Sequence, residues 1–423
     1  MSKRYIEYLD SGAPWISDVE SLRGMTRLKH VSTVQTGITL SGEGNPADPE
    51  WPYLRVANVQ VGYVAMREIK TVRVSPDRAA ASMLQPGDVL MTEGGDIDKL
   101  GRGALWRGQV PDMLHQNHIF AVRPSEALDS EFFVYWLDGS VARTYFRTTA
   151  KQTTNLAGTN KWTLGNLPIP VRPLEEQHAI ADYLDRETAR IDTLIEEQQR
   201  LIEMLRERRE ATIRSALLSG LDDAETAPSG VELLGTVPKH WRMVRTRYLC
   251  TITTGSEDSG NATDDGEYPF YVRGREILRI DHYSFEGEAV MTPGDGQGGT
   301  GKVFHYFDGK FEAHQRVYVF TDFMDVTGWY FYYFLSTFLR PVALAGSNTV
   351  TMESLRRPLL ADFKVAVPPI DEQQRITAYL DDQTAKIDTL MTEAERFIDL
   401  ARERRSALIT AAVTGKVDVR EAL

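Results

Sequence analysis

The chain has 423 residues, of which 42% are hydrophobic and 26% are charged, with a net charge of −12 and one cysteine, Cys250. This length allows two or three domains, and the composition is that of a folded protein rather than a disordered one. One cysteine excludes internal disulfides and multi-cysteine zinc sites. Because we find neither an apolar leader nor an apolar run long enough to cross a bilayer, we expect a cytoplasmic protein with no membrane segment.

The negative charge is spread along the chain. Residues 1–165, 166–222, 223–361 and 362–423 carry net charges of 0, −4, −5 and −3. None of these segments is a cationic block. Any affinity for nucleic acid therefore has to come from local clusters of basic residues or from partner subunits.

In chain order, residues 1–165 are predicted to be rich in strands, because short β-branched runs such as YLRVANVQV (53–61) alternate with Gly, Pro and Asp turn signals. Near the end of this segment, Tyr135–Phe146 is predicted to be a helix buried on most faces. Residues 223–361 repeat the pattern, with the strand-like runs AVMT and VYVF and a predicted buried helix at Trp329–Leu339.

Each strand-rich segment is followed by a long helical segment with a seven-residue period. A continuous helix over Glu175–Leu218 would span roughly 65 Å, with a break near Asp185–Thr188 allowed by the pattern. In the first helix the apolar residues at one heptad position are Leu184, Ile191 and Leu205, those at a second are Leu194 and Leu201, and Ile195 and Ile202 lie beside them. The matching residues in the second helix are Leu380, Ile387, Ala394 and Ala401, then Leu390 and Phe397, then Met391 and Ile398. We predict that the two helices pair as an antiparallel coiled coil; the alternative is that each packs only on its own domain.

The chain repeats itself. PLEEQHAIADYLDRETARIDTL (173–194) returns as PIDEQQRITAYLDDQTAKIDTL (369–390), and RERR (206–209) returns at 402–405. Shorter matches occur in the same order, namely Ser11-Gly12 with Ser229-Gly230, Thr36-Gly37 with Thr254-Gly255, Trp51-Pro52 with Tyr268-Pro269, GDVLMT (87–92) with GEAVMT (287–292), and His115-Gln116 with His314-Gln315. The offset falls steadily from 218 to 196 residues, as expected for a duplicated unit with deletions in its second copy.

The twice-given pattern P-x-x-E-Q-x-x-I-x-x-Y-L-D-x-x-T-x-x-I-D-x-L resembles the helical segments of the specificity subunits of type I restriction-modification systems. The ending A-x-L-x-x-x-V-T-G-K (407–416), Trp15 and VPKHW (237–241) also match that family. The resemblance covers essentially the whole chain. It implies an α+β fold with a pseudo-twofold internal repeat, in which two long conserved helices, paired as an antiparallel coiled coil, separate two target-recognition domains. The expected boundaries are 1–165 for target-recognition domain 1, 166–222 for the central helical region, 223–361 for target-recognition domain 2 and 362–423 for the C-terminal helical region.

The resemblance also implies a function. Each domain would read one half of a bipartite site in double-stranded DNA, and the helices would fix the spacer and dock two modification (methyltransferase) subunits, through which the restriction/translocase subunits join. If each helix docks the same partner, its outer surface is repeated for that reason. The predicted partner-binding residues are Glu176, Gln177, Tyr183, Asp185 and Asp192 in the first helix, and Glu372, Gln373, Tyr379, Asp381 and Asp388 in the second.

The candidate DNA-binding residues are Arg, Lys, Asn, Gln and hydroxyl side chains on loops in equivalent places of the repeat, because such groups pair with base edges. In the first domain they are Arg55, Asn58, Lys99, Arg102, Lys151, Gln152 and Asn155, with Gln116, Asn117 and Lys161 as weaker choices. In the second they are Arg273, Arg275, Gln297, Lys302, Gln315, Arg316, Ser347, Asn348 and Thr349. Any one of them could instead be an ordinary solvated residue.

Several segments match the sequence motifs of enzymes only in part. GQGGTGKV (296–303) has Val303 where a phosphate loop needs a hydroxyl for magnesium. Asp295 and Asp308-Gly309-Lys310 only partly match a metal-dependent nuclease, and the sole Pro-Pro pair lies outside any methyltransferase motif. His115 and His118 lack a completed ligand set. We therefore expect a non-catalytic protein with no metal or cofactor. Two alternatives stay open, a protein-binding scaffold with a coiled-coil interaction element and a nuclease in the second domain.

Overall fold

The computed structural model describes residues 25–39, 45–152, 157–170, 172–295, 301–345 and 355–419. It divides into two compact units, the first formed by residues 1–198 with 396–423 and the second by residues 199–395. Each unit contains one strand-rich domain and parts of two long helices, α6 (Leu174–Ser219) and α9 (Ile370–Thr414). Both helices therefore contribute to both units.

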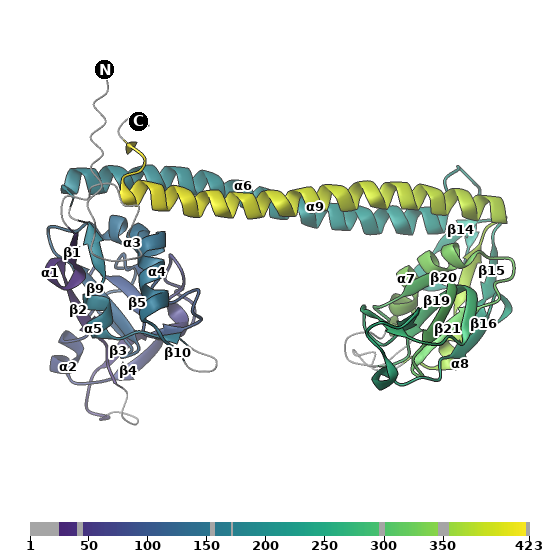
Figure 1. The fold of residues 1–423 in the computed structure, drawn as a ribbon, viewed down its shortest axis with the longest axis horizontal. Helices are drawn as coiled ribbons and strands as arrows, with labels where there is room; N and C mark the ends of the chain where they lie inside the picture. Colours follow the sequence, from purple (N-terminus) through teal and green to yellow (C-terminus); the bar gives the residue numbers. More distant parts are fainter. Residues whose placement is uncertain are drawn as a thin grey trace, which may run out of the picture. The chain divides into compact units, whose positions relative to one another are not determined.

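The domain of the first unit is built on a four-stranded sheet of order β2-β9-β5-β7 (Figure 1). Its strands are β2 (Ser32–Thr36), β9 (Ile119–Pro124), β5 (Val89–Thr92) and β7 (Gly103–Leu105). A three-stranded sheet accompanies it, with β3 (Glu50–Leu54) between β4 (Lys70–Arg73) and β8 (Leu114–His115). All these pairings are antiparallel except β3 with β8, which is parallel.

The domain of the second unit repeats this order within one six-stranded sheet, β16-β21-β19-β20-β17-β18. The strands are β16 (Thr251–Thr254), β21 (Val317–Thr321), β19 (Phe285–Pro293), β20 (His305–Ala313), β17 (Tyr268–Tyr271) and β18 (Ile277–Ile280). The end of β20 pairs in parallel with β17, as β8 pairs with β3. The repeats found in the sequence therefore lie at equivalent places, Trp51-Pro52 and Tyr268-Pro269 in β3 and β17, and the two VMT-like runs in β5 and β19.

The repeated Thr-Gly pairs end the first strand of each sheet. A Cβ atom on Gly37 would lie 2.0 Å from the carbonyl oxygen of His115, and one on Gly255 would lie 1.7 Å from that of Ala313. Only glycine allows two chain segments to pass this closely. The repeat of Thr36-Gly37 as Thr254-Gly255 is thus explained by backbone packing.

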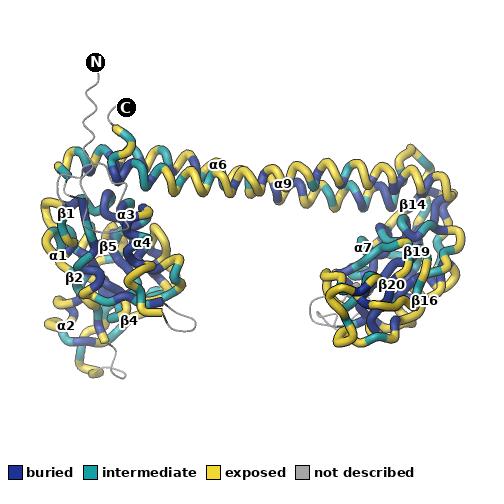
Figure 2. Tube along the Cα trace, in the orientation of Figure 1, coloured by how far each residue is buried: buried dark blue, intermediate teal, exposed yellow. Residues whose placement is uncertain are grey.

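Helices cover one face of each sheet and form the core with it. In the first unit α3 (Ser130–Asp138) and α4 (Ser140–Thr149) take the place of the single helix predicted at Tyr135–Phe146, because Gly139 adopts an extended conformation between them. In the second unit α7 (Gly328–Ala345) is one helix, as predicted. Phe132, Phe133 and Trp136 of α3, and Tyr330, Phe334 and Phe338 of α7, are completely buried. Buried segments of α3 and of the strand β5 are dark blue in Figure 2.

Short elements complete the two domains and extend them toward the helices. They are α1 (Leu28–Val31), α2 (Pro76–Ala80), α5 (Lys161–Gly165), α8 (Arg357–Asp362), β6 (Gly94–Gly95), β10 (Lys151–Gln152), β11 (Ala157–Gly158), β13 (Thr226–Pro228) and β14 (Thr236–Pro238). The strand β12 (Pro168–Pro170) pairs with β1 (Met25–Arg27), and β22 (Lys364–Val367) pairs with β15 (Arg242–Arg245). By these pairings the first domain continues past residue 165 and the second past residue 361.

Both long helices run without a break and pair with each other. At about 1.5 Å per residue, the 46 residues of α6 span roughly 69 Å. The seam is formed by the first predicted heptad position, including Leu184, Ile191 and Leu205, together with the flanking position of Ile202 and Ile398. The second predicted position was wrong, because Leu194, Leu201, Leu390 and Phe397 are 43%, 36%, 49% and 41% exposed. Heptad spacing alone does not say which of two adjacent apolar rows faces the partner helix.

Near the ends of the pair, helices and domain share one core. In the first unit Leu184 of α6 and Ile409, Ala412 and Val413 of α9 belong to the same hydrophobic cluster as α3. In the second unit Ala216, Leu217 and Leu380 belong to the cluster of α7. Burying one leucine completely contributes about 1.5–3 kcal/mol, so each domain is joined to the helices by its core and not by a loose linker.

We predict that Gly255→Ala destabilises the protein by about 1–3 kcal/mol or more, since the new Cβ would overlap the carbonyl group of Ala313. Gly274→Ala is the matched control, because a Cβ at that position meets nothing closer than 3.8 Å. Denaturant unfolding of the full chain measures both. Equal unfolding midpoints for the two variants would contradict the close approach at Gly255.

Candidate functional site: recognition surfaces and helix junctions

A buried glutamine of the long helix anchors each domain. In the first unit Gln177 is 1% exposed; its Oε1 accepts from the Asp129 amide at 2.9 Å, and its Nε2 donates to the carbonyls of Ala127 at 3.0 Å and Arg172 at 2.8 Å. In the second unit Gln373 is completely buried. It accepts from the Thr327 amide at 2.9 Å and donates to Asp325 at 3.0 Å and Pro368 at 2.9 Å. Each amide side chain thus closes the turn that leads into the domain helix.

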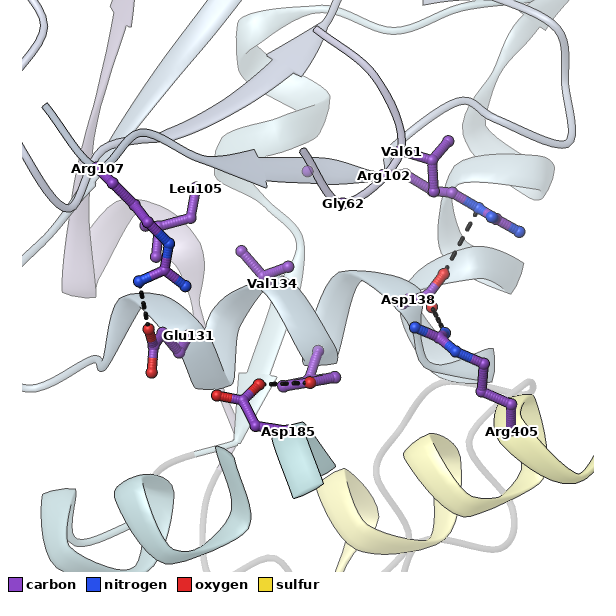
Figure 3. Close-up of a pocket in the computed structure, with 12 residues that line it drawn as sticks. Val61, Gly62, Arg102, Leu105, Arg107, Glu131, Val134, Asp138, Asp185 and Arg405 are labelled. Carbon is purple, nitrogen blue, oxygen red and sulfur yellow. Dashed lines mark hydrogen bonds and ion pairs between the residues drawn. The ribbon is translucent and has the colours of Figure 1, made fainter. Parts of the chain in front are cut away.

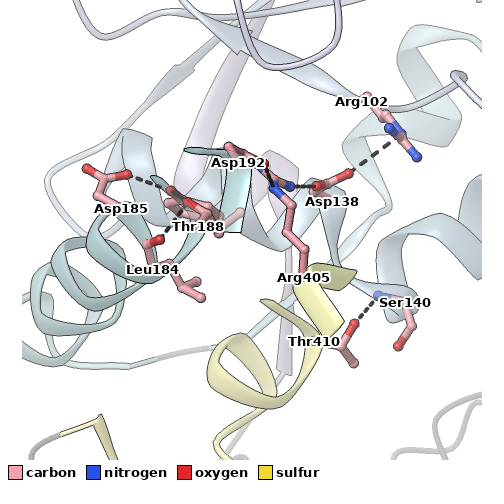
Figure 4. A network of polar contacts seen from close by, with 10 residues as sticks. Arg102, Asp138, Ser140, Leu184, Asp185, Thr188, Asp192, Arg405 and Thr410 are labelled. Atoms are coloured by element: carbon pink, nitrogen blue, oxygen red, sulfur yellow. Dashed lines mark hydrogen bonds and ion pairs between the residues drawn. The ribbon is translucent and has the colours of Figure 1, made fainter. Parts of the chain in front are cut away.

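About two helical turns farther along each long helix, an aspartate binds a tyrosine of the domain. The hydroxyl of Tyr135 donates to Asp185 at 2.6 Å and lies 3.2 Å from the Thr188 hydroxyl. Asp185 is labelled in Figures 3 and 4, and Thr188 in Figure 4. In the second unit Tyr333 donates to Asp381 at 2.6 Å, and the indole of Trp329 donates to the same carboxylate at 2.9 Å. Burial, together with the hydrogen bond to the carboxylate, raises the pKa of both tyrosines well above the usual value, so both remain donors at neutral pH.

An aspartate–arginine pair then joins the two long helices. In the first unit the Arg405 guanidinium binds Asp192 through two atoms, at 2.9 and 3.2 Å, and also contacts Asp138 of α3 at 3.4 Å (Figure 4). The repeat-equivalent pair in the second unit is Arg209 with Asp388, at 3.0 Å. Within the second unit Arg206 also pairs with Glu395, so residue numbers rise on one helix as they fall on the other and the helices are antiparallel.

These contacts give the predicted partner-binding residues an internal role. Gln177, Gln373 and Glu372 are too buried to meet a partner, and for them the assignment was wrong. Glu372 accepts from the Trp241 indole at 3.1 Å and lies 2.9 Å from His240, while Glu176 pairs with Arg172. Asp185, Asp192, Asp381 and Asp388 are occupied as described above. Tyr183 packs against the core as a partly buried residue, and Tyr379 is 39% exposed.

The residues that bind these repeated aspartates were not among the predicted site residues. Tyr135, Tyr333 and Trp329 lie in the buried-helix segments, and Arg405 and Arg209 are the last residues of the two RERR copies. The repeat of RERR was a usable signal. Arg209 and Arg405 are separated by the same 196 residues as Asp192 and Asp388. If the helices are assumed to be antiparallel, each arginine can be matched with the aspartate of the other helix.

In the first domain, one candidate DNA-binding residue has a purely structural role. Asn58 is 2% exposed; its side chain accepts from the Arg55 amide at 2.9 Å and donates to the carbonyls of Ala65 and Arg67 at 3.0 and 3.1 Å. All its hydrogen-bonding groups are used inside the domain, so the prediction that it contacts bases was wrong. Arg55 is partly held by the carbonyl of Glu68 at 3.2 Å.

The remaining candidates of the first domain gather in two places. Lys151 and Gln152 are exposed on β10, and Lys151 lines an open cleft of about 590 Å³ together with Val56, His118 and Asn160. Gln116 borders this region, since its side-chain Oε1 accepts a hydrogen bond from the Val56 amide at 3.4 Å. Lys99 and Arg102 lie elsewhere, on the loop that ends near α3, where they pair with Asp96 at 3.0 Å and Asp138 at 3.6 Å. Asn117 is partly buried and Lys161 exposed, whereas Asn155 lies outside the described residues.

In the second domain, two candidates meet on one carboxylate. Arg316 binds Asp295 at 2.7 Å, and Arg273 approaches the other oxygen of Asp295 at 3.8 Å. Gln315 beside them is exposed and lies 3.4 Å from Asp258. Arg275 and Lys302 are exposed as well. Gln297, Ser347, Asn348 and Thr349 lie outside the described residues.

A cavity of about 330 Å³ in the first unit lies between α3, α6, α9 and the strand β7 (Figure 3). Its charged lining is already paired, with Arg107 3.0 Å from Glu131 and Arg102 3.6 Å from Asp138. Within the described ranges, no group of three or more His, Cys, Asp or Glu side chains could hold a metal ion. No described helix is both long and apolar enough to span a membrane.

The repeated histidines lie at equivalent positions but serve the interior. His115 is completely buried, and its Nδ1 lies 3.0 Å from the carbonyl of Ser82. Burial lowers the pKa of His115 to about 4. His314 is 3% exposed, accepts from the Arg316 amide at 3.0 Å, and also has its pKa lowered, mainly by burial. Both are therefore neutral at pH 7.

Comparison with known proteins shows which family has this arrangement. The family described as "Type I restriction modification DNA specificity domain" matches residues 24–204 and again residues 238–396. The specificity subunit of the type I restriction enzyme EcoDI from Escherichia coli is 28% identical over 183 residues, which are 43% of this chain and 40% of that subunit. The chain thus aligns with less than half of the E. coli subunit. A putative type I restriction enzyme MjaX specificity subunit from Methanocaldococcus jannaschii is 21% identical over 418 residues, 92% of each chain.

Solved structures share the fold at lower identity. One solved structure comes from work on complex assembly and conformational transition of the type I R-M system. It has a TM-score of 0.69 at 18% identity, and the match covers 93% of this chain and 98% of the other. The HsdS subunit from Thermoanaerobacter tengcongensis has a TM-score of 0.57 at 15% identity, covering 93% and 97%. The predicted fold class, with two strand-rich domains and two long helices in an internal repeat, is confirmed.

We predict that the protein loses stability as the pH falls from about 6.5 to about 4. The pKa of His115 is lowered to about 4 in the folded state, so over this range the unfolded chain binds a proton that the folded chain does not. Above about pH 6.5 His115 is neutral in both states and causes no loss of stability. Below about pH 4 the loss in the free energy of unfolding reaches its full value of roughly 3 kcal/mol. Denaturant unfolding at a series of pH values measures it.

His115→Gln should flatten this part of the stability profile, even though the substitution itself lowers stability. His118→Gln is the control, since the His118 side chain is 56% exposed. An unchanged pH slope in His115→Gln would show that other groups cause the acid loss.

Proposed function

Because the chain belongs to the type I restriction-modification DNA specificity family, we propose that its two domains each read one half of a bipartite sequence in double-stranded DNA. The observation that carries this proposal is the doubled architecture. The same strand order is built twice and anchored twice by the same helix side chains, yet the exposed polar residues differ. To read two different half-sites, a protein needs two domains that are held in the same way but expose different polar side chains.

In the first domain we propose Lys151, Gln152 and Gln116 as base- or backbone-contacting residues. In the second we propose Arg273, Arg275, Lys302, Gln315 and Arg316. Arg273 and Arg316 share the Asp295 carboxylate, which holds two guanidinium groups in place before binding. Preorganised arginines are suited to guanine, because the planar fork can pair with O6 and N7 together.

The chain acts, in this proposal, as the non-catalytic subunit of an assembly. Two modification subunits would bind the helix pair and carry the methyltransferase activity, and restriction subunits would join through them. The length of α6 and α9 between the two domains would set the spacer between the half-sites.

The docking surface we propose for the modification subunits is apolar. In the first unit it consists of Leu194, Phe397 and Leu400, and in the second of Leu390, Leu201 and Met204; we call these the two apolar triads. All six side chains are between 36% and 54% exposed, and each residue of one triad has its repeat partner in the other.

One residue of each triad can be placed on the side of its helix that faces away from a contact with the domain. Leu194 follows Asp185 by nine residues, about two and a half turns, and so lies on the opposite side of α6 from the carboxylate that binds Tyr135. Leu390 has the same relation to Asp381. Exposed apolar residues gathered on one face commonly mark a protein interface, and the repeat provides two equal ones.

The decisive experiment for DNA reading maps methylated adenines in cells that carry the chain with its neighbouring modification and restriction genes. Two half-sites separated by a fixed spacer are expected. Exchanging residues 25–170 for the corresponding domain of another family member should change one half-site and leave the other intact. A change in both halves, or methylation without sequence preference, would contradict the assignment.

A second experiment tests the apolar triads. Phe397→Glu with Leu400→Glu should remove one modification subunit from the purified complex, because the carboxylates cannot be buried in an apolar interface without a large desolvation cost. Leu201→Glu with Met204→Glu should remove the other, and the combined variant should remove both. Native mass spectrometry gives the stoichiometry.

Met324→Glu is the control for these variants. Met324 is 58% exposed but belongs to the second domain and not to the helices, so this change should leave two modification subunits bound. A full complement of modification subunits in the combined variant would rule out the triads as the docking surface.

A further inference from the structure

Each unit contains an open cleft, lined by basic side chains, where its domain meets the long helices. The cleft of the second unit has a volume of about 960 Å³ and is lined by Arg209 and Arg214 of α6, Arg275 of the β17–β18 loop, Lys302 before β20, and Arg340 of α7. One acidic residue, Glu210, is in its lining. We call this the second-unit cleft.

The first-unit cleft occupies the repeat-equivalent place. Its volume is about 690 Å³, and five arginines line it, Arg102, Arg143, Arg147, Arg402 and Arg405, together with Asp98 and Asp138. Arg405 corresponds to Arg209 at the 196-residue offset of the helices, and Arg102 corresponds to Lys302 at the 200-residue offset of the nearby strands. The basic lining has therefore been built twice from corresponding segments.

The two clefts differ in how far their cations are neutralised. In the first unit Arg147 binds Asp98 at 2.6 Å, and Arg102 and Arg405 both approach Asp138. In the second unit Arg209 pairs with Asp388, and Arg214 lies over the Phe338 ring at 5.1 Å. Arg275, Lys302 and Arg340 have no carboxylate partner within the described part of the chain. Three cations thus face one cleft without an ion-pair partner among the described residues, and Glu210 is the one carboxylate in its lining.

We propose that both clefts take the phosphodiester backbone of DNA and hold it independently of base sequence, the second-unit cleft more strongly than the first. This inference rests on the DNA-reading function proposed above and adds where the chain grips the backbone. The proposed site for the DNA backbone lies where the domain meets the helices, whereas the Arg273–Asp295–Arg316 group, proposed above for base reading, belongs to the domain surface.

The distribution of the cations favours a polyanion with spaced charges. Arg275, Lys302 and Arg340 come from three separate segments around an open cleft, and three cations without an ion-pair partner among the described residues create a local positive potential there that attracts an anion, although the chain as a whole has a net charge of −12. Successive phosphates along a DNA strand provide evenly spaced negative charges, and most protein–DNA hydrogen bonds go to backbone oxygens. Two of these cations, Arg275 and Lys302, lie on loops of the domain itself, so the cleft extends from the long helix to the domain.

The test uses the full chain co-expressed and purified with its modification subunits. Fluorescence anisotropy measures the affinity for a duplex carrying the sequence found by methylation mapping and for a shuffled duplex, over a range of salt concentrations. The triple variant Arg275→Gln, Lys302→Gln, Arg340→Gln should weaken both duplexes by the same factor and lower the slope of log affinity against log salt by about two to three, since each lost phosphate contact removes about 0.9.

A charge-matched control separates the cleft from general electrostatics. Lys239→Gln, Arg242→Gln and Arg247→Gln remove three cations that pair with Glu225, Asp325 and Asp362. This control has the same net charge as the triple variant and should keep nearly the wild-type slope. Because Arg340 is half-buried, the double variant Arg275→Gln, Lys302→Gln is measured as well and should lower the slope by one to two, that is, by about 0.9 for each contact.

Two results would overturn the proposal and leave DNA reading intact. One is a wild-type protein that prefers the mapped duplex while both cleft variants keep its salt slope. The other is loss of modification subunits from the cleft variants, which would assign the cations to an acidic protein surface. A wild-type complex that binds both duplexes equally would instead contradict the function proposed for the whole chain, and the cleft proposal with it.

Discussion

The structure of each unit depends on one buried amide. Gln177 and Gln373 each satisfy one backbone donor and two backbone acceptors at the turn where a domain joins its long helix. With about 1 kcal/mol for each hydrogen bond, such an amide contributes roughly 3 kcal/mol, and an apolar residue of similar size would leave three buried polar groups without partners. The domain therefore has a fixed orientation on its own helix, which is the condition for presenting a recognition surface in a defined way.

The contacts that follow along the helix have a different role. Asp185 and Asp381 bind the domain through tyrosine hydroxyls, whereas Asp192 and Asp388 bind arginines of the other helix. The side chains of Arg405 and Asp192 are 30% and 47% exposed, so their ion pair adds little net stability. Its two-point geometry does fix the axial register of the helices. Buried apolar side chains of the seam provide the stability, and the ion pairs select which layers meet.

Much of this could be predicted from the sequence. The repeat gave the two units, the seven-residue period gave the helices and their pairing, and Thr36-Gly37 and its copy marked a real backbone constraint. One of the three predicted rows of the seam was wrong, because Leu194 and Leu201 are as apolar as Ile191 and Ile202, which do lie in it. Asn58 and Gln177 were taken for surface residues because a polar side chain that serves buried backbone groups has the same sequence signature as one that faces solvent. Only the partner atoms distinguish the two, and those lie up to 50 residues away along the chain.

The same limit applies to charge. Residues 223–361 carry a net charge of −5, yet three cations of this segment, which have no ion-pair partner in the described ranges, meet two arginines of α6 in the second-unit cleft. Acidic residues of the same segment are paired elsewhere, as Asp325 is with Arg242 and Glu225 with Lys239. Net charge counts all these groups equally, whereas an anion approaching the cleft responds to the nearest unpaired ones, because water and salt screen the rest within about 10 Å. An acidic chain can therefore offer a basic surface, provided that folding brings together cations that are distant in sequence and pairs its carboxylates away from them.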